Sequence, residues 1–420
     1  MSKDFKLASW SKDAVLYEVN IRQYTVEGTF ASFQNHLSRL KQMGVDILWL
    51  MPITPISILK RQGRLGSYYA CSSFTKINEE FGSIEEFKTL IKEAHQIGLK
   101  VIIDWVANHT GCDHEWTKTN SEYFIKDIEG NFTERNGWKD VIDLNYNNKE
   151  MQAAMIQSMQ FWINECDIDG FRCDMAHLVQ LDFWKVARKE CDKLKELFWL
   201  AECDDKNYLD VFDVNYAWSW MHLTEKLMKQ EIKLQNLILN MQSYLSSSCQ
   251  KFKLFFTSNH DENSWNGTEY EKYGIASRAF AVLAFTWFGF PLIYSGQEIP
   301  NKKRLLFFEK DVIDWSYELK LENFYSKLSL LHKIISNEDA IFEILSSEKD
   351  EFCFAYIKQS KTELLIIILN LSKQDRIKFS LSNSLISGSF LNVFSEMEYH
   401  FNCNENFELM AGDFLVFRKL

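Results

Sequence analysis

The chain has 420 residues, of which 46% are hydrophobic and 25% are charged, a profile typical of a soluble globular protein. Its formal net charge of −11 argues against a general electrostatic attraction to nucleic acid or to an anionic membrane. Aromatic residues make up 15% of the chain, while Gly and Pro number only 16 and 4, which excludes disordered, collagen-like and low-complexity proteins. We therefore expect no nucleic-acid partner and no membrane partner.

The amino-terminal residues carry early acidic side chains and lack an apolar core, so we expect no signal peptide. The longest nearly apolar run, residues 279–294, is too short to cross a membrane and predicts a buried helix followed by a buried strand. The nine cysteines include no C-x-x-C pair, which argues against a zinc ribbon or a thioredoxin-like motif. These features predict a cytoplasmic location.

Predicted strands and helices alternate through most of the chain. Continuous apolar runs such as residues 45–51 are typical of strands buried on both faces. The helix at 83–97 begins with a capping box and ends at Gly98. In chain order, the predicted strands cover residues 14–20, 45–51, 100–106, 170–174, 198–202, 211–214, 253–257 and 291–294. The main predicted helices cover residues 30–43, 83–97, 149–166 and 181–194.

Eight strands separated by helical stretches predict a parallel sheet that closes into a barrel. A polar stretch interrupts the alternation after the third strand, and from residue 341 the chain consists of short alternating runs without a long helix. We therefore expect an α/β protein. Its (β/α)8 TIM barrel would comprise residues 1–109 and 149–340, with a short insert at 110–148 after strand three and a C-terminal antiparallel β-sandwich at 341–420.

Charged residues follow several predicted strands at the end where TIM barrels carry their catalytic groups. Arg172 and Asp174 lie at the end of the fourth strand, Glu202 at the end of the fifth and Asp261 after the seventh. Their spacing matches one or two strand–helix units, so we expect them to project toward one mouth of the barrel. Three carboxylates and one arginine suit glycosyl transfer, which needs a nucleophile, an acid/base and a stabilising group.

The local sequence suggests different roles for two of these carboxylates. Arg172 and Asp174 are two residues apart in a strand, so they share a face, and the guanidinium would keep Asp174 ionised as a nucleophile requires. Glu202 follows the apolar run 199–201. Apolar surroundings raise the pKa of a carboxyl group, as a general acid requires. A close pair of this kind predicts cleavage with retention of configuration.

Four strings of the sequence resemble, in order, the conserved regions of glycoside hydrolase family 13, the α-amylase family. They are DWVANH at 104–109, GFRCD at 170–174, WLAE at 199–202 and SNHD at 258–261, with further similarity at 44–52, 143–145 and 289–298. The resemblance covers the whole chain and implies the same barrel, insert and C-terminal β-sandwich. It implies that Asp174 is the nucleophile, Glu202 the acid/base and Asp261 the carboxylate that binds the sugar hydroxyls, with Arg172 orienting Asp174.

The resemblance also implies substrate-binding residues. His109 and His260 would hydrogen-bond the sugar at the cleavage site, and Tyr69 would stack on it. Many relatives carry Pro or His where Tyr68 stands, which leaves the choice between the two tyrosines open. Many α-amylases carry the pair Lys-His three residues after the nucleophile, whereas this chain has His177 followed by Leu178. His177 is a candidate for contacts on the leaving-group side.

No cofactor is implied as obligatory, but the resemblance raises the question of calcium. Asn108 matches a position that ligates calcium in many relatives, and it can equally be a structural residue that holds its loop. The accompanying aspartate stays open between Asp127, Asp140 and Asp143.

The resemblance implies an α-amylase-type hydrolase that cleaves α-1,4-glucosidic bonds in starch, glycogen or maltodextrins by double displacement. Its partner would be an α-glucan or a malto-oligosaccharide. The alternatives are a 4-α-glucanotransferase or an α-glucosidase of the same family and, more distantly, a non-catalytic glucan-binding protein on the same fold. The sequence leaves the oligomeric state open.

Overall fold

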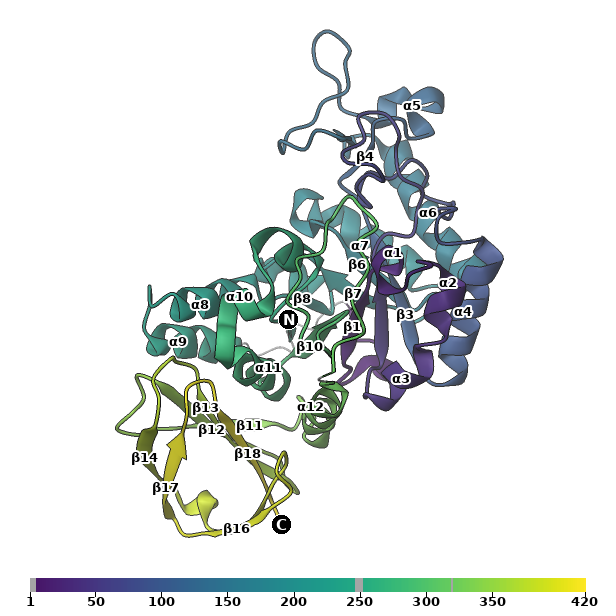
Figure 1. Ribbon diagram of the computed structural model, residues 1–420. Coiled ribbons are helices and arrows are strands. Elements are labelled where there is room, and N and C mark those ends of the chain that lie inside the picture. Colours follow the sequence, from purple (N-terminus) through teal and green to yellow (C-terminus); the bar gives the residue numbers. More distant parts are fainter. Residues whose placement is uncertain (1–4, 246–251, 319) are drawn as a thin grey trace. The chain divides into compact units, whose positions relative to one another are not determined.

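The structure is a computed structural model that describes residues 5–245, 252–318 and 320–420 (Figure 1). Eight parallel strands form a closed barrel in the order β1-β10-β9-β8-β7-β6-β3-β2, which confirms the predicted TIM barrel. The strands are β1 (Leu16–Val19), β2 (Ile47–Leu50), β3 (Lys100–Trp105), β6 (Gly170–Cys173), β7 (Phe198–Ala201), β8 (Val214–Tyr216), β9 (Phe252–Phe255) and β10 (Phe290–Tyr294).

Helices lie between successive strands of the barrel, and one more helix follows β10 (Figure 1). They are α1 (Ile21–Tyr24), α2 (Phe30–Gln34), α3 (Leu37–Gln42), α4 (Ile84–Gln96), α6 (Lys149–Cys166), α7 (Leu181–Cys191), α8 (Trp218–Met228), α9 (Leu234–Leu245), α10 (Glu269–Tyr273), α11 (Ser277–Thr286) and α12 (Glu322–Ile334). Among the helices that the structure describes, none has the length and apolar character needed to cross a membrane.

The chain divides into two compact units. The first consists mainly of Leu16–Tyr216 and Leu305–Trp315, and the second mainly of Ala217–Arg304 and Ser316–Leu420. The first unit therefore contains six of the barrel strands and the insert. The second contains β9, β10 and the C-terminal β domain.

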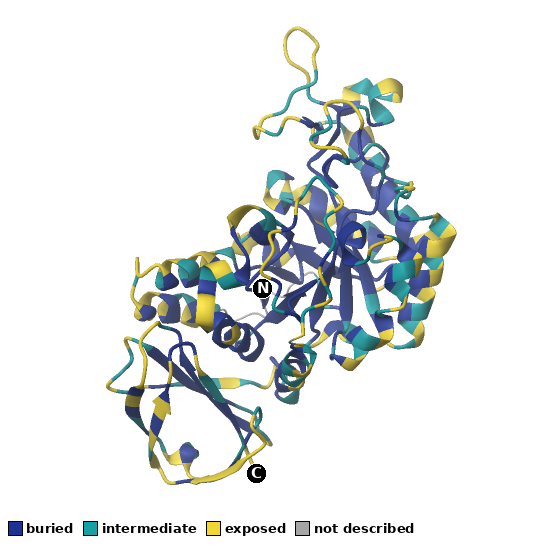
Figure 2. Cartoon of the chain, viewed as in Figure 1, coloured by how far each residue is buried: buried dark blue, intermediate teal, exposed yellow. Residues whose placement is uncertain are grey.

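The barrel strands of the first unit are buried almost completely, as Figure 2 shows in dark blue, and only Lys100 at the start of β3 is partly exposed. β2 has the sequence ILWL, and each of its side chains is buried. The amphipathic helix α4 buries only one face, because its apolar residues recur at helical spacing, and that face consists of Phe87, Leu90, Ile91 and Ala94. α4 starts at the predicted capping box, in which Ser83 and Glu86 each accept the other's backbone N–H.

A short insert follows β3, as predicted, and the structure shows that its two strands are antiparallel. β4 (His109–Gly111) pairs with β5 (Val141–Asp143), and His109 lies opposite Asp143. Between these strands the insert contains the short helix α5 (Trp116–Thr119) and an exposed tip at residues 127–131 (Figure 2).

Two predicted elements differ from the structure. The helix predicted at 30–43 is split into α2 and α3, because Asn35 and His36 form a turn between them. The strand predicted at 211–214 was placed too early, since β8 begins only at Val214. Its first residues are buried in a turn after a 3₁₀-helix, and an apolar run does not distinguish a buried turn from a buried strand.

The C-terminal part of the second unit is an antiparallel β domain, as predicted (yellow in Figure 1). Its core combines side chains of both sheets, among them Ile366, Phe379 and Phe407. The larger sheet contains β11 (Ile341–Leu345), β12 (Cys353–Gln359), β13 (Leu364–Asn370), β18 (Phe414–Lys419), β15 (Gly388–Asn392) and β16 (Glu398–Phe401). The smaller contains β14 (Ile377–Ser382) and β17 (Asn404–Leu409).

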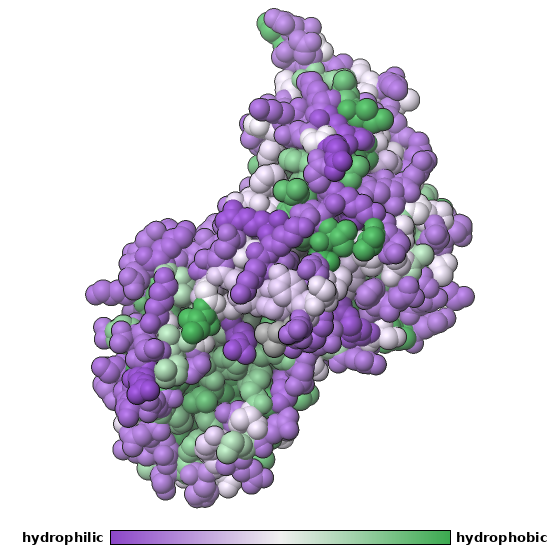
Figure 3. Space-filling view, viewed as in Figure 1, coloured by the Kyte–Doolittle hydropathy of each residue, from purple (hydrophilic) through white to green (hydrophobic). Residues whose placement is uncertain are grey.

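The face of the molecule drawn in Figure 3 is largely hydrophilic and carries scattered apolar patches. Large apolar side chains that are exposed in the first unit include Ile58, Leu59 and Leu306. The cysteines that the structure describes are all free thiols, and only Cys403 among them is exposed. Each of the others is therefore part of the packed interior.

Candidate active site

Arg172 is the centre of a cluster of acidic groups at the carboxyl ends of β3, β6 and β7. Its side chain is fully buried, and its Nη1 donates to both carboxylate oxygens of Asp104 at 2.9 and 3.2 Å and to Asp174 Oδ1 at 3.0 Å. Its Nη2 lies 2.9 Å from Glu202 Oε2. Burial would lower the pKa of Arg172, but Asp104 and Glu202 raise it well above its ordinary value, so the guanidinium stays charged.

Register explains why these side chains meet. Asp104 lies opposite Arg172 in the β3–β6 pair, and Arg172 lies opposite Leu200 in the β6–β7 pair. Asp174 and Glu202 directly follow their strands, with Asp174 donating its N–H to Trp105 O and Glu202 donating its N–H to Cys173 O. The cluster is therefore built from the ladder of the parallel sheet itself, which is a rigid support.

Three further side chains surround this cluster. Tyr69 Oη and Trp49 Nε1 each donate to Asp104 Oδ2 at 3.1 Å, and Arg172 Nε donates to Tyr216 Oη at 3.1 Å. Asp104 therefore accepts hydrogen bonds from Tyr69, Trp49 and Arg172. These hydrogen bonds indicate that Asp104 positions Arg172 and Tyr69 and does not itself take part in bond cleavage.

The surroundings of Glu202 differ from the apolar environment expected from the sequence. The residues before it, 199–201, are fully buried, but its carboxylate contacts a guanidinium that belongs to another strand. Glu202 Oε2 also accepts the backbone N–H of Met175 at 2.8 Å. Met175 adopts a left-handed backbone conformation with φ of 40°, which is strained for a residue with a side chain. This turn aims its N–H at Glu202 immediately after Asp174.

The structure distinguishes between the two candidate tyrosines. Tyr68 is almost completely buried beneath Arg22, whose guanidinium carbon lies 4.2 Å from the ring centre, and burial raises the pKa of Tyr68 to about 12. Tyr69 instead reaches the carboxylate cluster through Asp104. The geometry therefore favours Tyr69 for the predicted sugar-stacking position.

His109 starts β4 and joins the same region through the backbone of Tyr69. Burial lowers the pKa of His109 to about 4, although the carboxylates of Asp140 and Asp143 oppose this shift. The imidazole is therefore neutral near neutral pH and can donate one hydrogen bond and accept another. Its ring centre lies 5.0 Å from that of Trp138.

His260 and Asp261 belong to the second unit, where they follow β9. His260 Nε2 lies 3.3 Å from Asp261 Oδ2. Asp261 precedes a single π-helical turn, Glu262–Asn266, and such turns are frequent at functional sites. The partnership of Asp261 with Asp174 and Glu202 stays a prediction from the sequence. His177 lies on a short 3₁₀-helix after Asp174 and is exposed.

A model of the alpha-amylase catalytic domain matches residues 12–138 and 125–327 of the chain. These residues include the whole cluster around Arg172. The chain belongs to the α-amylase family, glycoside hydrolase family 13. It is accordingly an α-amylase-like glycoside hydrolase that acts on α-glucans.

Members of the α-amylase family resemble this chain over nearly its full length. A noncanonic maltogenic alpha-amylase, AmyB from Thermotoga neapolitana, is 28% identical with a TM-score of 0.89, covering 98% of this chain and 99% of that one. An alpha-amylase from Lactobacillus plantarum is 27% identical with a TM-score of 0.89, covering 98% and 100%. The maltogenic alpha-amylase of Bacillus acidopullulyticus is 23% identical, covering 91% of this chain and 69% of that protein. The chain spans 57% of the length of another relative, the alpha-amylase MalA of Haloarcula japonica.

The α-amylase family raises the question of calcium at the position of Asn108. Asn108 is buried, and its amide contacts His109 Nδ1 at 3.3 Å. Asp140 and Asp143 each have one buried oxygen without a hydrogen-bond partner, whereas Asp127 lies on the exposed tip. Calcium takes six to eight oxygen ligands, and within the described ranges no three His, Cys, Asp or Glu side chains gather to hold a metal ion.

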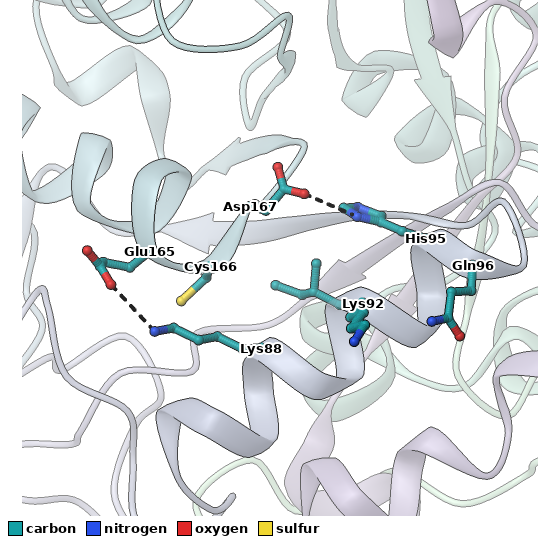
Figure 4. A pocket seen from close by; sticks show the side chains of 8 residues that line it. Lys88, Lys92, His95, Gln96, Glu165, Cys166 and Asp167 are labelled. Atoms are coloured by element: carbon teal, nitrogen blue, oxygen red, sulfur yellow. Dashed lines mark hydrogen bonds and ion pairs between the residues drawn. The ribbon is translucent and has the colours of Figure 1, made fainter.

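A hollow of about 500 Å³ on the outside of the barrel, between α4 and α6, is unconnected with this cluster (Figure 4). Lys88 pairs with Glu165 across it, and His95 lies 3.4 Å from Asp167. His95 also contacts Asp169, which precedes β6, whereas Asp174 follows β6. The hollow is therefore near the amino-terminal end of this strand, where barrel residues serve stability rather than catalysis.

Sequence reasoning missed three residues that contact the cluster. Tyr216 ends β8, and a correct prediction of that strand would have identified it as a polar residue at a carboxyl end. Trp49 lies inside a strand that reads as continuous core. Met175 contributes through its backbone N–H, which leaves no signal in the side-chain pattern.

Proposed function

We propose that the protein is an α-amylase-type hydrolase that cleaves α-1,4-glucosidic bonds in starch, glycogen or maltodextrins with retention of configuration. The observation that carries this proposal is that one guanidinium, that of Arg172, contacts both Asp174 and Glu202. Two carboxylates that share one guanidinium are close together, and a short separation is the mark of retaining glycosidases.

Asp174 is assigned as the nucleophile. It receives a directed hydrogen bond from Arg172 Nη1, which favours the ionised carboxylate. Its oxygen would attack the anomeric carbon and form a covalent glycosyl-enzyme while the bond to the leaving oxygen breaks. Because Asp174 directly follows β6 and donates its N–H to Trp105 O, its backbone is fixed for this attack.

Glu202 is assigned as the acid/base. It would protonate the leaving oxygen and then take a proton from the water that releases the sugar from Asp174. Arg172 Nη2 lies close to Glu202 but makes no hydrogen bond to it. Glu202 directly follows β7 and accepts the backbone N–H of Met175 at 2.8 Å. These contacts hold its carboxyl group beside Asp174, from where it can reach the leaving oxygen.

Asp261 and His260 are assigned to the sugar hydroxyls, as the family resemblance implies, and Tyr69 and His109 to the sugar bound next to Asp174. A neutral His109 suits this role, since a glucose hydroxyl needs a hydrogen-bond partner rather than a charge. His177, which is exposed after Asp174, is assigned to the leaving-group side.

A chromatographic time course with maltoheptaose tests the proposal. Hydrolysis predicts only shorter products, formed together with rising reducing ends and initially with the anomeric configuration of the substrate. Longer and shorter products at constant reducing ends would instead identify a 4-α-glucanotransferase, and release of single terminal glucose units an α-glucosidase. Intact maltoheptaose and intact starch, together with tight glucan binding, would favour the non-catalytic alternative.

A further inference from the structure

We propose that Phe307 is a specificity-determining residue that contacts the glucose unit next to the one at Tyr69, on the non-reducing side of the cleaved bond. The inference rests on the proposed function, because it uses the roles of Tyr69 and Glu202. Phe307 belongs to Leu305–Trp315, which we call the strap, and which is part of the first compact unit.

The strap is tied to the segments that follow β1 and β2, beside which it runs (green in Figure 1). Gln23 Nε2 donates to Leu306 O at 2.9 Å, and Ile313 N donates to Gln23 O at 2.9 Å. Arg64 pairs with Glu309 at 2.8 Å through its side chain and donates its backbone N–H to the same carboxylate at 3.0 Å. The strap is therefore held along its length rather than at one point.

A glycine permits the closest approach between the strap and the loop after β2. Gly63 has a φ of +61°, and a Cβ added to it would lie 2.5 Å from the Cβ of Phe308. Leu65 N donates to Phe308 O two residues further along that loop, at 3.2 Å. Since a larger residue would force the two segments apart, the position of the strap is fixed by packing as well as by hydrogen bonds.

Phe307 lies directly beside the tyrosine that is assigned to the sugar. Its ring centre is 6.2 Å from that of Tyr69, with only 16° between the ring planes, and it meets Tyr68 edge-on at 5.7 Å. Phe307 remains partly exposed. A partly exposed aromatic ring nearly parallel to Tyr69 extends the surface on which the apolar face of a sugar can pack.

The side of the cleaved bond follows from the position of the acid. Glu202 must reach the leaving oxygen, so the leaving part of the glucan lies toward β7. Tyr69 follows β2, and β2 and β7 are separated by β3 and β6 in the barrel order. A sugar chain that continues past Tyr69 away from Glu202 therefore meets the strap, and the first side chain of the strap beside Tyr69 is Phe307.

The test compares Phe307→Ala and Phe307→Tyr with Leu306→Ala as the matched control. Leu306 is the neighbouring strap residue, and its side chain is 60% exposed. We expect Phe307→Ala to lower kcat/KM for maltoheptaose about tenfold, mostly through KM, and to shift the cleavage pattern of end-labelled maltoheptaose toward bonds with fewer glucose units on the non-reducing side. Phe307→Tyr should retain the wild-type pattern, and Leu306→Ala should match the wild type in both measurements.

Binding of maltoheptaose by calorimetry to Glu202→Gln, with and without Phe307→Ala, separates this inference from the proposed function. Wild-type protein that fails to cleave any α-1,4-glucan would overturn the proposed function and the inference with it. Active wild-type protein with an unchanged cleavage pattern and unchanged affinity in Phe307→Ala would overturn the inference alone. Thermal unfolding of each variant identifies a loss caused by misfolding, and in that case Phe307→Leu replaces the alanine variant.

Discussion

The guanidinium of Arg172 lies 2.9 Å from Glu202 Oε2. Through its other terminal nitrogen it also donates to Asp174 at 3.0 Å. The candidate acid and the candidate nucleophile thus share one buried cation, so their positions and their charges are coupled. A substitution at any of these residues should affect catalysis through that coupling as well as through the lost side chain.

Replacement of Glu202 by Gln should abolish turnover and preserve binding. The amide keeps the shape of the carboxyl group and can still accept the N–H of Met175, but it cannot donate a proton to the leaving oxygen. We expect kcat for maltoheptaose to fall by about 10³-fold or more, while the dissociation constant measured by calorimetry stays within about threefold.

Glu190→Gln, on the outer helix α7, is the control for this substitution and should retain wild-type kcat. If Glu202→Gln turned over maltoheptaose at a rate close to that of the wild type, another residue would have to supply the proton.

Replacement of Arg172 by Met should destabilise the protein strongly, because it leaves carboxylates buried without their cation. Removing one partner of a buried ion pair typically costs about 3–5 kcal/mol. Urea unfolding at neutral pH should show a loss of this size. Arg172→Lys should recover part of the stability but little activity, since lysine cannot contact Asp104, Asp174 and Glu202 in the same planar arrangement.

Arg304→Met provides the comparison, because the ion pair of Arg304 with Glu271 is about half exposed on both sides, and exposed pairs contribute about 1 kcal/mol or less. If Arg172→Met lost no more stability than Arg304→Met, Arg172 would not be the cation on which the buried carboxylates depend.

The barrel, the insert and the C-terminal domain were predictable because each has its own hydrophobic pattern. Runs such as ILWL in β2 mark strands buried on both faces, and the shift to short alternating runs at residue 341 marks the change to antiparallel strands. The pattern failed at 211–214, where Val211 is buried in a turn. Hydrophobic runs report burial, and burial is not confined to regular elements.

The candidate site was predictable only at the level of side chains next to one another along a strand. Arg172 and Asp174 share a face of β6, so their contact followed from sequence spacing. The contact between Arg172 and Glu202 depends on the register between β6 and β7, which the sequence does not state. For the same reason the environment of Glu202 was predicted as apolar, although a cation from the neighbouring strand lies beside it.

Treatment with a chelator should leave the activity on maltoheptaose unchanged within about 20%. Asn108 contacts His109 and lies beside the insert, and its backbone carbonyl accepts the N–H of Leu144 at 3.3 Å. These contacts are sufficient for a structural role. Activity and thermal unfolding before and after dialysis against EDTA measure the effect. A loss of activity that calcium restores, but magnesium does not, would instead assign Asn108 to a calcium site.

The stability of the protein should fall steeply in acid because of Asp169. Burial opposes ionisation of this carboxyl group, but the hydrogen bond and charge of His95 and the charge of Lys195 lower the pKa of Asp169 from 3.8 to about 2. A carboxyl group with a lowered pKa stabilises the folded state above pH 3.8, and this contribution is lost as the pH falls toward 2. The pKa difference corresponds to about 2 kcal/mol.

Asp169→Asn should therefore reduce the free energy of unfolding at pH 6 and flatten its decline between pH 4 and pH 2. Urea unfolding across this range measures both effects. Asp182→Asn is the control, because Asp182 is 91% exposed and should leave the profile unchanged. If the free energy of unfolding of Asp169→Asn and of the wild type fell in parallel between pH 4 and pH 2, Asp169 would not be the source of the acid sensitivity.

Glu269 should have the opposite effect, since it is a buried carboxyl group and no cation among the described residues contributes to its pKa shift. Burial raises the pKa of Glu269 from 4.5 to about 7, against the lowering effect of hydrogen bonds from Gln297 at 2.6 Å and Thr257 at 3.1 Å. Between pH 4.5 and pH 7 the unfolded chain releases this proton and the folded protein keeps it, so stability falls as the pH rises. The cost reaches about 3 kcal/mol above pH 7.

Glu269→Gln removes this cost, because the amide oxygen can accept both hydrogen bonds and carries no charge at any pH. We expect the variant to be more stable than the wild type at pH 8 and nearly equal to it at pH 4.5, as measured by urea unfolding. Glu351→Gln, at an exposed position, should show no such dependence. Equal stability of Glu269→Gln and the wild type at pH 8 would mean that Glu269 ionises in the folded protein as readily as in the unfolded chain.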